Sequence, residues 1–264
     1  MSHQPCYMCD RPGTSKEHVP PRCLFPETRD AGGNHRRNLI TVPSCEEHNS
    51  RKSADDEFLM VSLAGIIGNN SIGYRHKCSK VNRAIYRSSF ALLDQAMANR
   101  QVHAVEIAPN KFLDVICGTP DQDRLKVCFD RIARGLFYNL FGSKFRGRCK
   151  SILGYLKSDS ANATEFQRLV RDKVRSELGD KPRVGDNPAV FSFQFTDLDA
   201  FGLRLLHTQF YGGLDVYTAF LPDNTELPFD LGIELMNRGI RTTFEIGAEK
   251  YHFNADESDN ANVE

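Results

Sequence analysis

Residues 6–52 read CYMCDRPGTSKEHVPPRCLFPETRDAGGNHRRNLITVPSCEEHNSRK, and this stretch decides how the first part of the chain folds. A Cys-x-x-Cys pair opens it at Cys6 and Cys9, and a Cys-x-x-His pair closes it at Cys45 and His48. Two such pairs on separate segments commonly supply the four thiolate or imidazole ligands that zinc binds in a tetrahedron. The spacing therefore predicts a zinc ion that joins the two ends of the stretch.

The segment between the two pairs is rich in proline and glycine and has little helical periodicity. Turns and loops bury too little apolar surface to offset the entropy of ordering the chain, so a bound metal must help to hold them. Residues 17–20 and 38–42 are expected to form two short strands. Ser44 is a suitable N-cap for a helix that starts at Cys45 and ends near residues 62–65.

After this stretch the sequence predicts helices and then a sheet, so the expected fold class is α+β. Apolar residues at helical spacing predict helices over 81–97, 125–141 and 163–178. Strand patterns cover 190–195, 203–210 and 216–221, and a hairpin is expected around Gly247 within 242–253. The remaining cysteines have no partner at ligand spacing and are expected to pack in the core: Cys78, Cys117, Cys128 and Cys149.

Two domains are expected, with the boundary after residue 67. The first, 1–67, contains the two metal-binding pairs. The second, 68–264, is expected to be helical over about 75–180 and mostly strands over about 187–254. Its last residues, 255–264, are acidic and polar and are expected to be disordered.

The composition is that of an ordinary globular protein. Of the 264 residues 40% are hydrophobic and 26% are charged, and no apolar run is long enough to cross a bilayer. The first residues lack the features of a secretion signal, so a cytoplasmic location and reduced cysteines are expected. A formal net charge of zero argues against binding of nucleic acid by the whole surface, and leaves such contacts to local basic patches.

The dipeptide Glu17-His18 lies between the two metal-binding pairs and offers groups suited to catalysis. A zinc ion with four protein ligands has no open coordination position, so any reaction must use other residues. The carboxylate of Glu17 could bind a hard cation, and the imidazole of His18 could deprotonate water near neutral pH.

Taken together, four elements in this order resemble the HNH endonucleases, also called His-Me finger or ββα-metal nucleases. The elements are Cys6-x-x-Cys9, Glu17-His18-Val19-x-Pro21, Asn38-Leu39 and Cys45-x-x-His48-Asn49-x-x-Lys52. The resemblance covers about the first sixty residues and implies a ββα-metal module. It implies that His18 activates the attacking water and that Asn38 fixes the hairpin around it. Glu17 and Asn49 would hold a catalytic Mg²⁺ or Mn²⁺.

One position departs from the family pattern. Zinc-bearing members commonly have a second Cys-x-x-Cys pair, and here His48 takes the place of its last cysteine. We align His48 with the zinc ligand and Asn49 with the catalytic ligand, which makes an HNN variant and puts Lys52 at the family's spacing. In the other register His48 is catalytic, and the zinc is held by Cys6, Cys9 and Cys45 with Cys23 or His35.

The resemblance also implies the partner and the reaction, which is hydrolysis of DNA phosphodiester bonds. Candidate phosphate contacts are Arg36, Arg37, Arg51 and Lys52. Family members with an extra domain often act in restriction or antiviral defence, so a second copy of the chain or a defence-system protein is a candidate partner. Two alternatives stay open: a zinc module that binds nucleic acid or protein without cutting, and a ligand-sensing region after Gly68 that controls the nuclease.

Overall fold

The computed structural model describes residues 4–50, 53–158, 160–200, 202–223 and 228–254. Helices and antiparallel strand pairs are both present, so the expected α+β class is confirmed. The chain divides into two compact units. The first contains 1–145, 183–193 and 208–215, and the second contains 146–182, 194–207 and 216–264. The expected module 1–67 lies inside the first unit.

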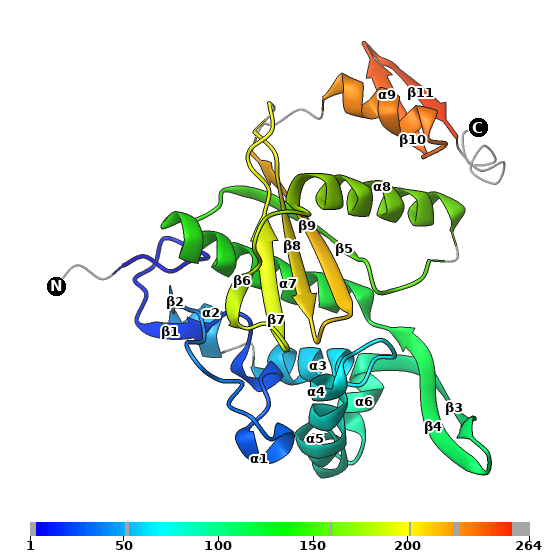
Figure 1. Cartoon of the computed structure of the whole chain (residues 1–264). Helices are drawn as coiled ribbons and strands as arrows, with labels where there is room; N and C mark the ends of the chain where they lie inside the picture. The colour runs from blue at the N-terminus through cyan, green and yellow to red at the C-terminus, as the bar shows by residue number, and fades with distance from the viewer. Residues whose placement is uncertain (1–3, 51–52, 159, 201, 224–227, 255–264) are drawn as a thin grey trace. The chain divides into compact units, whose positions relative to one another are not determined.

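The first unit begins with two short strands and two helices that follow them directly (Figure 1). Strand β1 (Ser15–His18) pairs antiparallel with β2 (Thr41–Ser44), which places Glu17 opposite Val42 and His18 opposite Thr41. Helices α2 (Glu46–Ser50) and α3 (Ser53–Leu63) follow. The two strands and the helical character after Cys45 were predicted, with bounds two to three residues different.

A short 3-10 helix, η1 (Arg22–Leu24), and helix α1 (Thr28–Ala31) connect the two strands. Leu24 is fully buried, and its carbonyl accepts a hydrogen bond of 2.6 Å from the hydroxyl of Tyr211. Phe58 and Leu59 of α3 are also buried. The loop between β1 and β2 therefore packs on an apolar interior. Metal binding is not the only interaction that orders it.

Residues 71–96 form several short helices. They are α4 (Ser71–His76), the π-helix η2 (Lys77–Val81), α5 (Asn82–Arg87) and α6 (Ala91–Ala96). The prediction of one helix over 81–97 is wrong at Ser89 and Phe90, whose φ angles of 50° and 69° are left-handed and end α5. The apolar periodicity continues across this break, which is why the sequence did not mark it.

The expected helical region 75–180 also contains three strands, which is a second correction. Strands β3 (Met97–Ala108) and β4 (Lys111–Pro120) form a long antiparallel hairpin that extends away from α6 (Figure 1). Asn110 has a φ of 57° at the turn, a conformation that asparagine tolerates. The hairpin is largely exposed, so it lacks the alternation of apolar and polar residues that marks a strand with one buried face.

Helix α7 (Gln122–Phe141) was predicted from residue 125 and is confirmed. The Asp121 side chain caps its start by accepting from the Arg124 backbone N–H at 3.0 Å. Cys128 on this helix is buried as expected, and Cys149 is half-buried. Cys78 and Cys117 are exposed, so their expected place in the core is wrong. Cys78 lies on the outer side of η2, and Cys117 lies on the exposed hairpin.

A five-stranded sheet has the order β5-β9-β8-β7-β6. Its strands are β5 (Gly147–Leu153), β6 (Val184–Asn187), β7 (Phe191–Phe195), β8 (Arg204–Phe210) and β9 (Leu214–Pro222). Strands β7, β8 and β9 were predicted. Strand β5 was not predicted from the sequence, because its exposed face carries the basic residues Arg148 and Lys150 in place of an apolar pattern.

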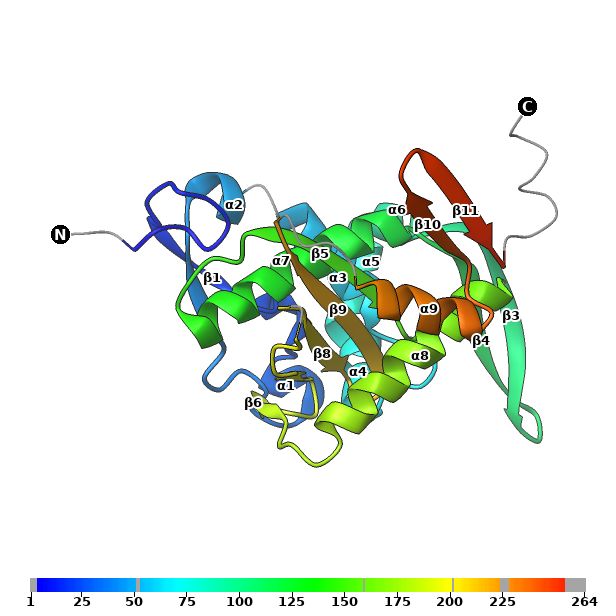
Figure 2. The same ribbon diagram turned by 90° about the horizontal axis from the view of Figure 1, so that it is seen from above.

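The second unit is completed by helices and a hairpin. Helix α8 (Ala161–Leu178) was predicted and runs along the sheet (Figure 2). Its residues Val174 and Leu178 pack with Tyr217. Helix α9 (Phe229–Asn237) was not predicted. Strands β10 (Thr242–Ile246) and β11 (Glu249–Phe253) form the expected hairpin, with Gly247 at a φ of 64°. The expected acidic tail, 255–264, lies outside the described residues.

Candidate metal centre and the Glu17-His18 strand

The first metal-binding pair lies on a compact loop before β1. The backbone N–H of Cys6 donates to Arg11 O at 2.9 Å, and the N–H of Met8 approaches the Cys6 sulfur at 3.5 Å. The N–H of Tyr7 donates to Pro43 O of β2 at 2.9 Å. The first two contacts close the loop that carries Cys6 and Cys9, and the third attaches this loop to β2, which leads to Cys45.

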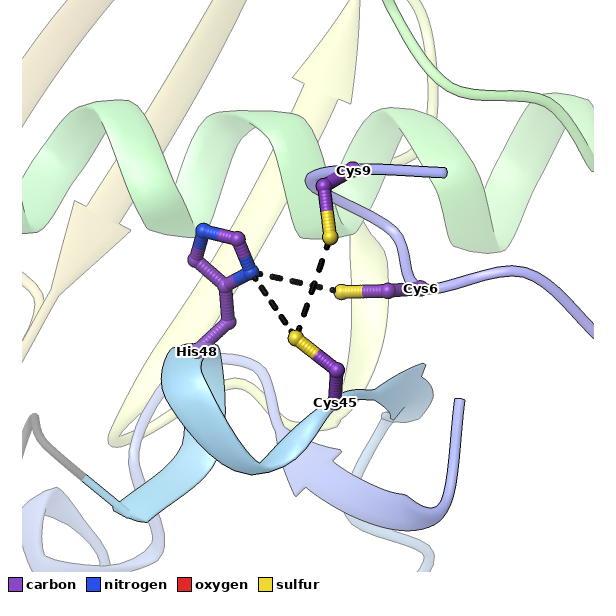
Figure 3. Close-up of side chains that lie close together, drawn as sticks. All are labelled: Cys6, Cys9, Cys45 and His48. Atoms are coloured by element: carbon purple, nitrogen blue, oxygen red, sulfur yellow. Dashed lines mark hydrogen bonds between the residues drawn. The ribbon is translucent and has the colours of Figure 1, made fainter. Parts of the chain in front are cut away.

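The second pair lies at the start of α2. The N–H groups of His48 and Asn49 both donate to Cys45 O, at 3.2 and 3.0 Å, so residues 45–49 form the first helical turn. Positions three apart on a helix share a face, which directs the side chains of Cys45 and His48 to one point. Figure 3 shows that they converge there with Cys6 and Cys9.

The four ligand atoms have the spacing of a tetrahedral zinc site. All lie within 4.8 Å of one another. Cys9 Sγ is 3.7 Å from Cys45 Sγ, and His48 Nδ1 is 3.6 Å from Cys6 Sγ and 3.2 Å from Cys45 Sγ. Usual zinc bond lengths give roughly 3.8 Å between two sulfurs and 3.6 Å between sulfur and nitrogen in a tetrahedron. The expected cluster is therefore present, and its donors fit zinc.

Burial and backbone N–H groups shift the pKa of these ligands, and burial raises the pKa of the Cys9 thiol. Burial raises the pKa of the Cys6 thiol, but the N–H groups of Met8, Cys45 and Cys9 that face its sulfur outweigh this and lower the pKa. Burial lowers the pKa of His48, which favours the neutral imidazole. A thiolate and a neutral imidazole are the forms that bind a metal.

The position of His48 bears on the two registers that the sequence allows. His48 lies with the three cysteines. Cys23 is elsewhere, with its Sγ donating to Asp56 O at 3.2 Å, and the ring of His35 packs near Gly33. Within the described residues, no other group of three or more His, Cys, Asp or Glu side chains is close enough to hold an ion.

Glu17 and His18 end β1 in different surroundings. The side chain of Glu17 faces inward, and the residue is only 4% exposed. It lies near the buried hydroxyl of Tyr7, whose pKa is raised first by burial and then by the negative charge of Glu17. His18 is half-buried. The strand therefore directs a carboxylate inward and leaves the neighbouring imidazole partly open to solvent.

Asn49 connects α2 to β1. Its Nδ2 donates to Ser15 Oγ at 2.8 Å, and Ser15 Oγ donates to Ser44 O at 2.9 Å. Because side chains alternate along a strand, Ser15 and Glu17 share one face of β1. The amide oxygen of Asn49 is left as the acceptor on that side.

Asn38 has a different environment from the one that the resemblance implies. It is exposed, with a left-handed φ of 44°. Its side chain makes no hydrogen bond to any residue in the described part of the chain. The backbone bond from Val19 N–H to Ile40 O, at 3.0 Å, extends the β1–β2 pairing beyond His18 instead.

The four candidate phosphate contacts also differ from one another. Arg36 is held in place, since its Nε donates to Phe25 O at 2.9 Å and its Nη1 is 3.2 Å from Glu27 Oε1. Only 18% of the Arg36 side chain is exposed, which suits a structural role better than a DNA contact. Arg37 is exposed. Arg51 and Lys52 lie outside the described residues.

A half-buried ion cluster between α3 and α7 had no signal in the sequence. Asp55 Oδ1 accepts from Arg124 Nε at 2.9 Å, and Asp55 Oδ2 accepts from Arg131 Nη1 at 2.5 Å. These arginines are 69 and 76 residues away along the chain, so only the fold brings them together. The cluster fixes the start of α3, directly after the metal-bearing turn.

Comparison with known proteins adds nothing to this picture: no family model, curated protein or solved structure matches the chain. None of the helices in the described part of the chain is both long and apolar enough to cross a membrane.

Proposed function

We propose that this chain is a metal-dependent DNA endonuclease of the HNH type, with His18 as the general base. The observation that carries the proposal is the arrangement of β1, β2 and α2 around the Cys6, Cys9, Cys45 and His48 cluster. Two antiparallel strands followed by a short helix are the elements that a ββα-metal module requires, and their order here supports the proposal. This arrangement brings Glu17-His18, at the end of β1, into one small unit with Asn49 on α2.

The two metals in this proposal have separate duties. Zinc on Cys6, Cys9, Cys45 and His48 has four protein ligands, so it holds the module together and takes no part in the reaction. A magnesium or manganese ion would be held by the Glu17 carboxylate and the Asn49 amide oxygen. Such ions commonly take only one or two protein oxygens, and the rest of their ligands are water and phosphate.

Glu17 and Asn49 can share this second ion because Asn49, on α2, bonds to Ser15, which lies on the same face of β1 as Glu17. The bond from Asn49 Nδ2 to Ser15 Oγ turns the Asn49 amide so that its oxygen is left to accept. When bound there, the cation would neutralise charge on the phosphate in the transition state and on the leaving oxygen.

In the reaction itself, His18 holds and deprotonates the attacking water. The water oxygen forms a bond to phosphorus while the bond from phosphorus to the 3′ oxygen breaks, and the departing oxygen takes a proton from solvent. His18 must start as neutral imidazole in order to accept the proton. The cutting rate is therefore expected to fall in acid.

One observation favours the alternative of a module that binds without cutting. Glu17 is 4% exposed, so a hydrated cation would reach its carboxylate only if the end of β1 opened. Under this alternative the buried carboxylate serves the packing around Tyr7 and the zinc cluster serves recognition. The two functions differ in whether any phosphodiester bond is broken.

The test is cleavage of supercoiled plasmid by the zinc-loaded protein with added Mg²⁺ or Mn²⁺, with an RNA substrate in parallel. Wild type should nick the plasmid, and His18→Ala should lower the rate at least about a hundredfold while zinc content stays unchanged. His103→Ala is the matched control, since His103 is exposed on β3. DNA binding by wild type with no cleavage under any cation would establish the alternative.

A further inference from the structure

Positive charge is concentrated in one part of a chain that is neutral overall. Residues 58–93 contain no aspartate or glutamate and carry five basic residues: Arg75, Lys77, Lys80, Arg83 and Arg87. The rest of the chain has 29 basic and 34 acidic residues. A local field of this kind attracts anions even though the net charge of the molecule is zero.

All five basic residues lie on the consecutive helices α4, η2 and α5. One side of this run is buried and consists of small or apolar residues with His76: Gly73, Val81, Ala84 and Ile85. The other side is exposed and includes Arg75, Cys78, Arg83, Tyr86 and Arg87. We call this exposed side, together with Phe90, the basic helix face.

The basic helix face is held against the segment that follows the candidate catalytic strand. His76 Nε2 donates to Cys23 O at 3.0 Å, and Arg75 Nη1 donates to Ala31 O at 3.2 Å. Arg83 Nη2 lies 2.8 Å from Asp30 Oδ1. The anchored segment begins five residues after His18. The helices therefore stand in a fixed relation to β1 within one unit.

Some of the positive charge on this face stays available. Within the described residues, no ion pair involves Arg87, which is exposed on this face, or Lys77 and Lys80, which are half-buried beside it. By contrast, helix α8 carries basic residues that alternate with acidic ones and pair with them, as in Arg168 with Glu165 and Lys173 with Glu177. The run 58–93 has no acidic residue of its own, and its pairing with Asp30 of α1 uses Arg83 and leaves Arg87 without an ion pair among the described residues. This separates the basic helix face from an ordinary solvated helix surface.

Exposed aromatic rings lie beside these charges. Tyr86 is 65% exposed and Phe90 is 45% exposed, and the two rings meet edge to face with centroids 5.5 Å apart. The left-handed backbone at Ser89 and Phe90 ends the helix there. Arginine and tyrosine side chains are among the groups that contact phosphate and sugar in protein–DNA complexes.

We propose that the basic helix face contacts the phosphate backbone of duplex DNA beyond the segment that is cut. This rests on the proposed nuclease function and extends it, because the face would determine where the duplex lies relative to His18. Arg87 supplies the phosphate contact, the half-buried Lys77 and Lys80 add positive charge beside it, and Tyr86 packs against the sugar edge.

The test measures binding and cleavage separately on the full, zinc-loaded chain. Binding to a fluorescent 30-base-pair duplex is followed by anisotropy at several salt concentrations without added Mg²⁺ or Mn²⁺. The variants are Arg87→Glu and Tyr86→Ala, both at exposed positions. Arg171→Glu is the matched control, because Arg171 is an exposed arginine on α8. Thermal melting checks that every variant is folded.

Arg87→Glu is expected to weaken duplex binding about fivefold to tenfold and to reduce the slope of log affinity against log salt by about one. Arg171→Glu should leave both unchanged. Equal affinities for wild type, Arg87→Glu and Tyr86→Ala would overturn the proposal, as would a wild-type protein that does not bind DNA. If binding responds as expected but no condition gives cleavage, the binding surface stands and the nuclease proposal fails.

Discussion

Gly135 of α7 lies directly against Val19, the residue that follows His18. A Cβ built at Gly135 would be 2.6 Å from Val19 Cγ2 and 3.2 Å from Val19 Cβ. Glycine inside a helix is normally unfavourable by about 0.5–1 kcal/mol relative to alanine. Here it lets the helix backbone approach the end of β1 more closely than any other residue would.

This contact predicts that Gly135→Ala destabilises the protein, contrary to the usual gain from such a change. The side chain of valine is stiff, so the added methyl must displace β1 or α7, at a cost of about 1–3 kcal/mol. Urea unfolding measures the change, and the rate of plasmid nicking should fall with it. A gain in stability would show that the contact is loose.

Removal of one zinc ligand should release the metal. Cys9→Ser and Cys45→Ser each remove one of four donors, and zinc content is expected to fall from about one per chain to near zero. Elemental analysis of protein purified with zinc measures this. Cys117→Ser is the control, because Cys117 is exposed and outside the cluster. Full zinc retention by Cys45→Ser would contradict the ligand assignment.

The pH dependence of stability should carry a contribution from His76. Burial lowers the pKa of this imidazole from 6.5 to about 4. Between those two values the unfolded chain binds a proton that the folded protein does not, so the free energy of unfolding decreases as the pH falls from 6.5 to 4. The loss amounts to about 3 kcal/mol when complete.

His76→Phe removes this titration, so its free energy of unfolding should depend less on pH than that of wild type across the same interval. The comparison of slopes is needed because acid also protonates the zinc ligands in both proteins. Unfolding in guanidinium at half-unit pH steps gives the two curves. Parallel curves would mean that His76 accepts a proton in the folded state.

Asp55→Asn tests the half-buried ion cluster of Asp55, Arg124 and Arg131. Burial raises the pKa of this carboxyl, but its bonds to Arg131 and Arg124 outweigh burial and hold the pKa below its ordinary value. The variant leaves two arginines with a weaker partner and is expected to cost about 1–3 kcal/mol. Asp123→Asn should change stability by less than about 0.5 kcal/mol, since that side chain is 96% exposed. Equal changes in the free energy of unfolding for the two variants would show that the ion cluster does not stabilise the fold.

The metal cluster could be predicted from sequence because its signal is local. Cys6 with Cys9, and Cys45 with His48, are each close enough in the chain to share one ion, and the pairing of the two segments follows from the metal itself. The strands over 15–18 and 41–44 were predicted, with shifted bounds, from short strand-type runs near proline residues. The long helices α7 and α8 were found because one apolar stripe of each is buried.

The other features depend on contacts between distant residues or on exposed surface. The hairpin β3–β4 has little buried surface to impose a pattern, and the break at Ser89 and Phe90 uses residues that do not normally signal a left-handed turn. Glu17 is buried, and Arg36 is hydrogen-bonded, by residues that are not neighbours in the sequence and come close only in the fold. Local spacing therefore identified candidate residues, and their accessibility came from the fold.

The cluster also acts as a crosslink that closes a loop of chain. Cys9 and Cys45 are 36 residues apart, and closing a loop of that length costs roughly 3 kcal/mol of chain entropy. The pairing of two four-residue strands, β1 and β2, does not stabilise the fold enough to offset this loss of chain entropy. A chelator that extracts zinc would therefore release this loop, with Glu17 and His18 on it, and would also remove any added Mg²⁺ or Mn²⁺. Loss of cutting in such a chelator therefore combines unfolding of the module with loss of the catalytic cation.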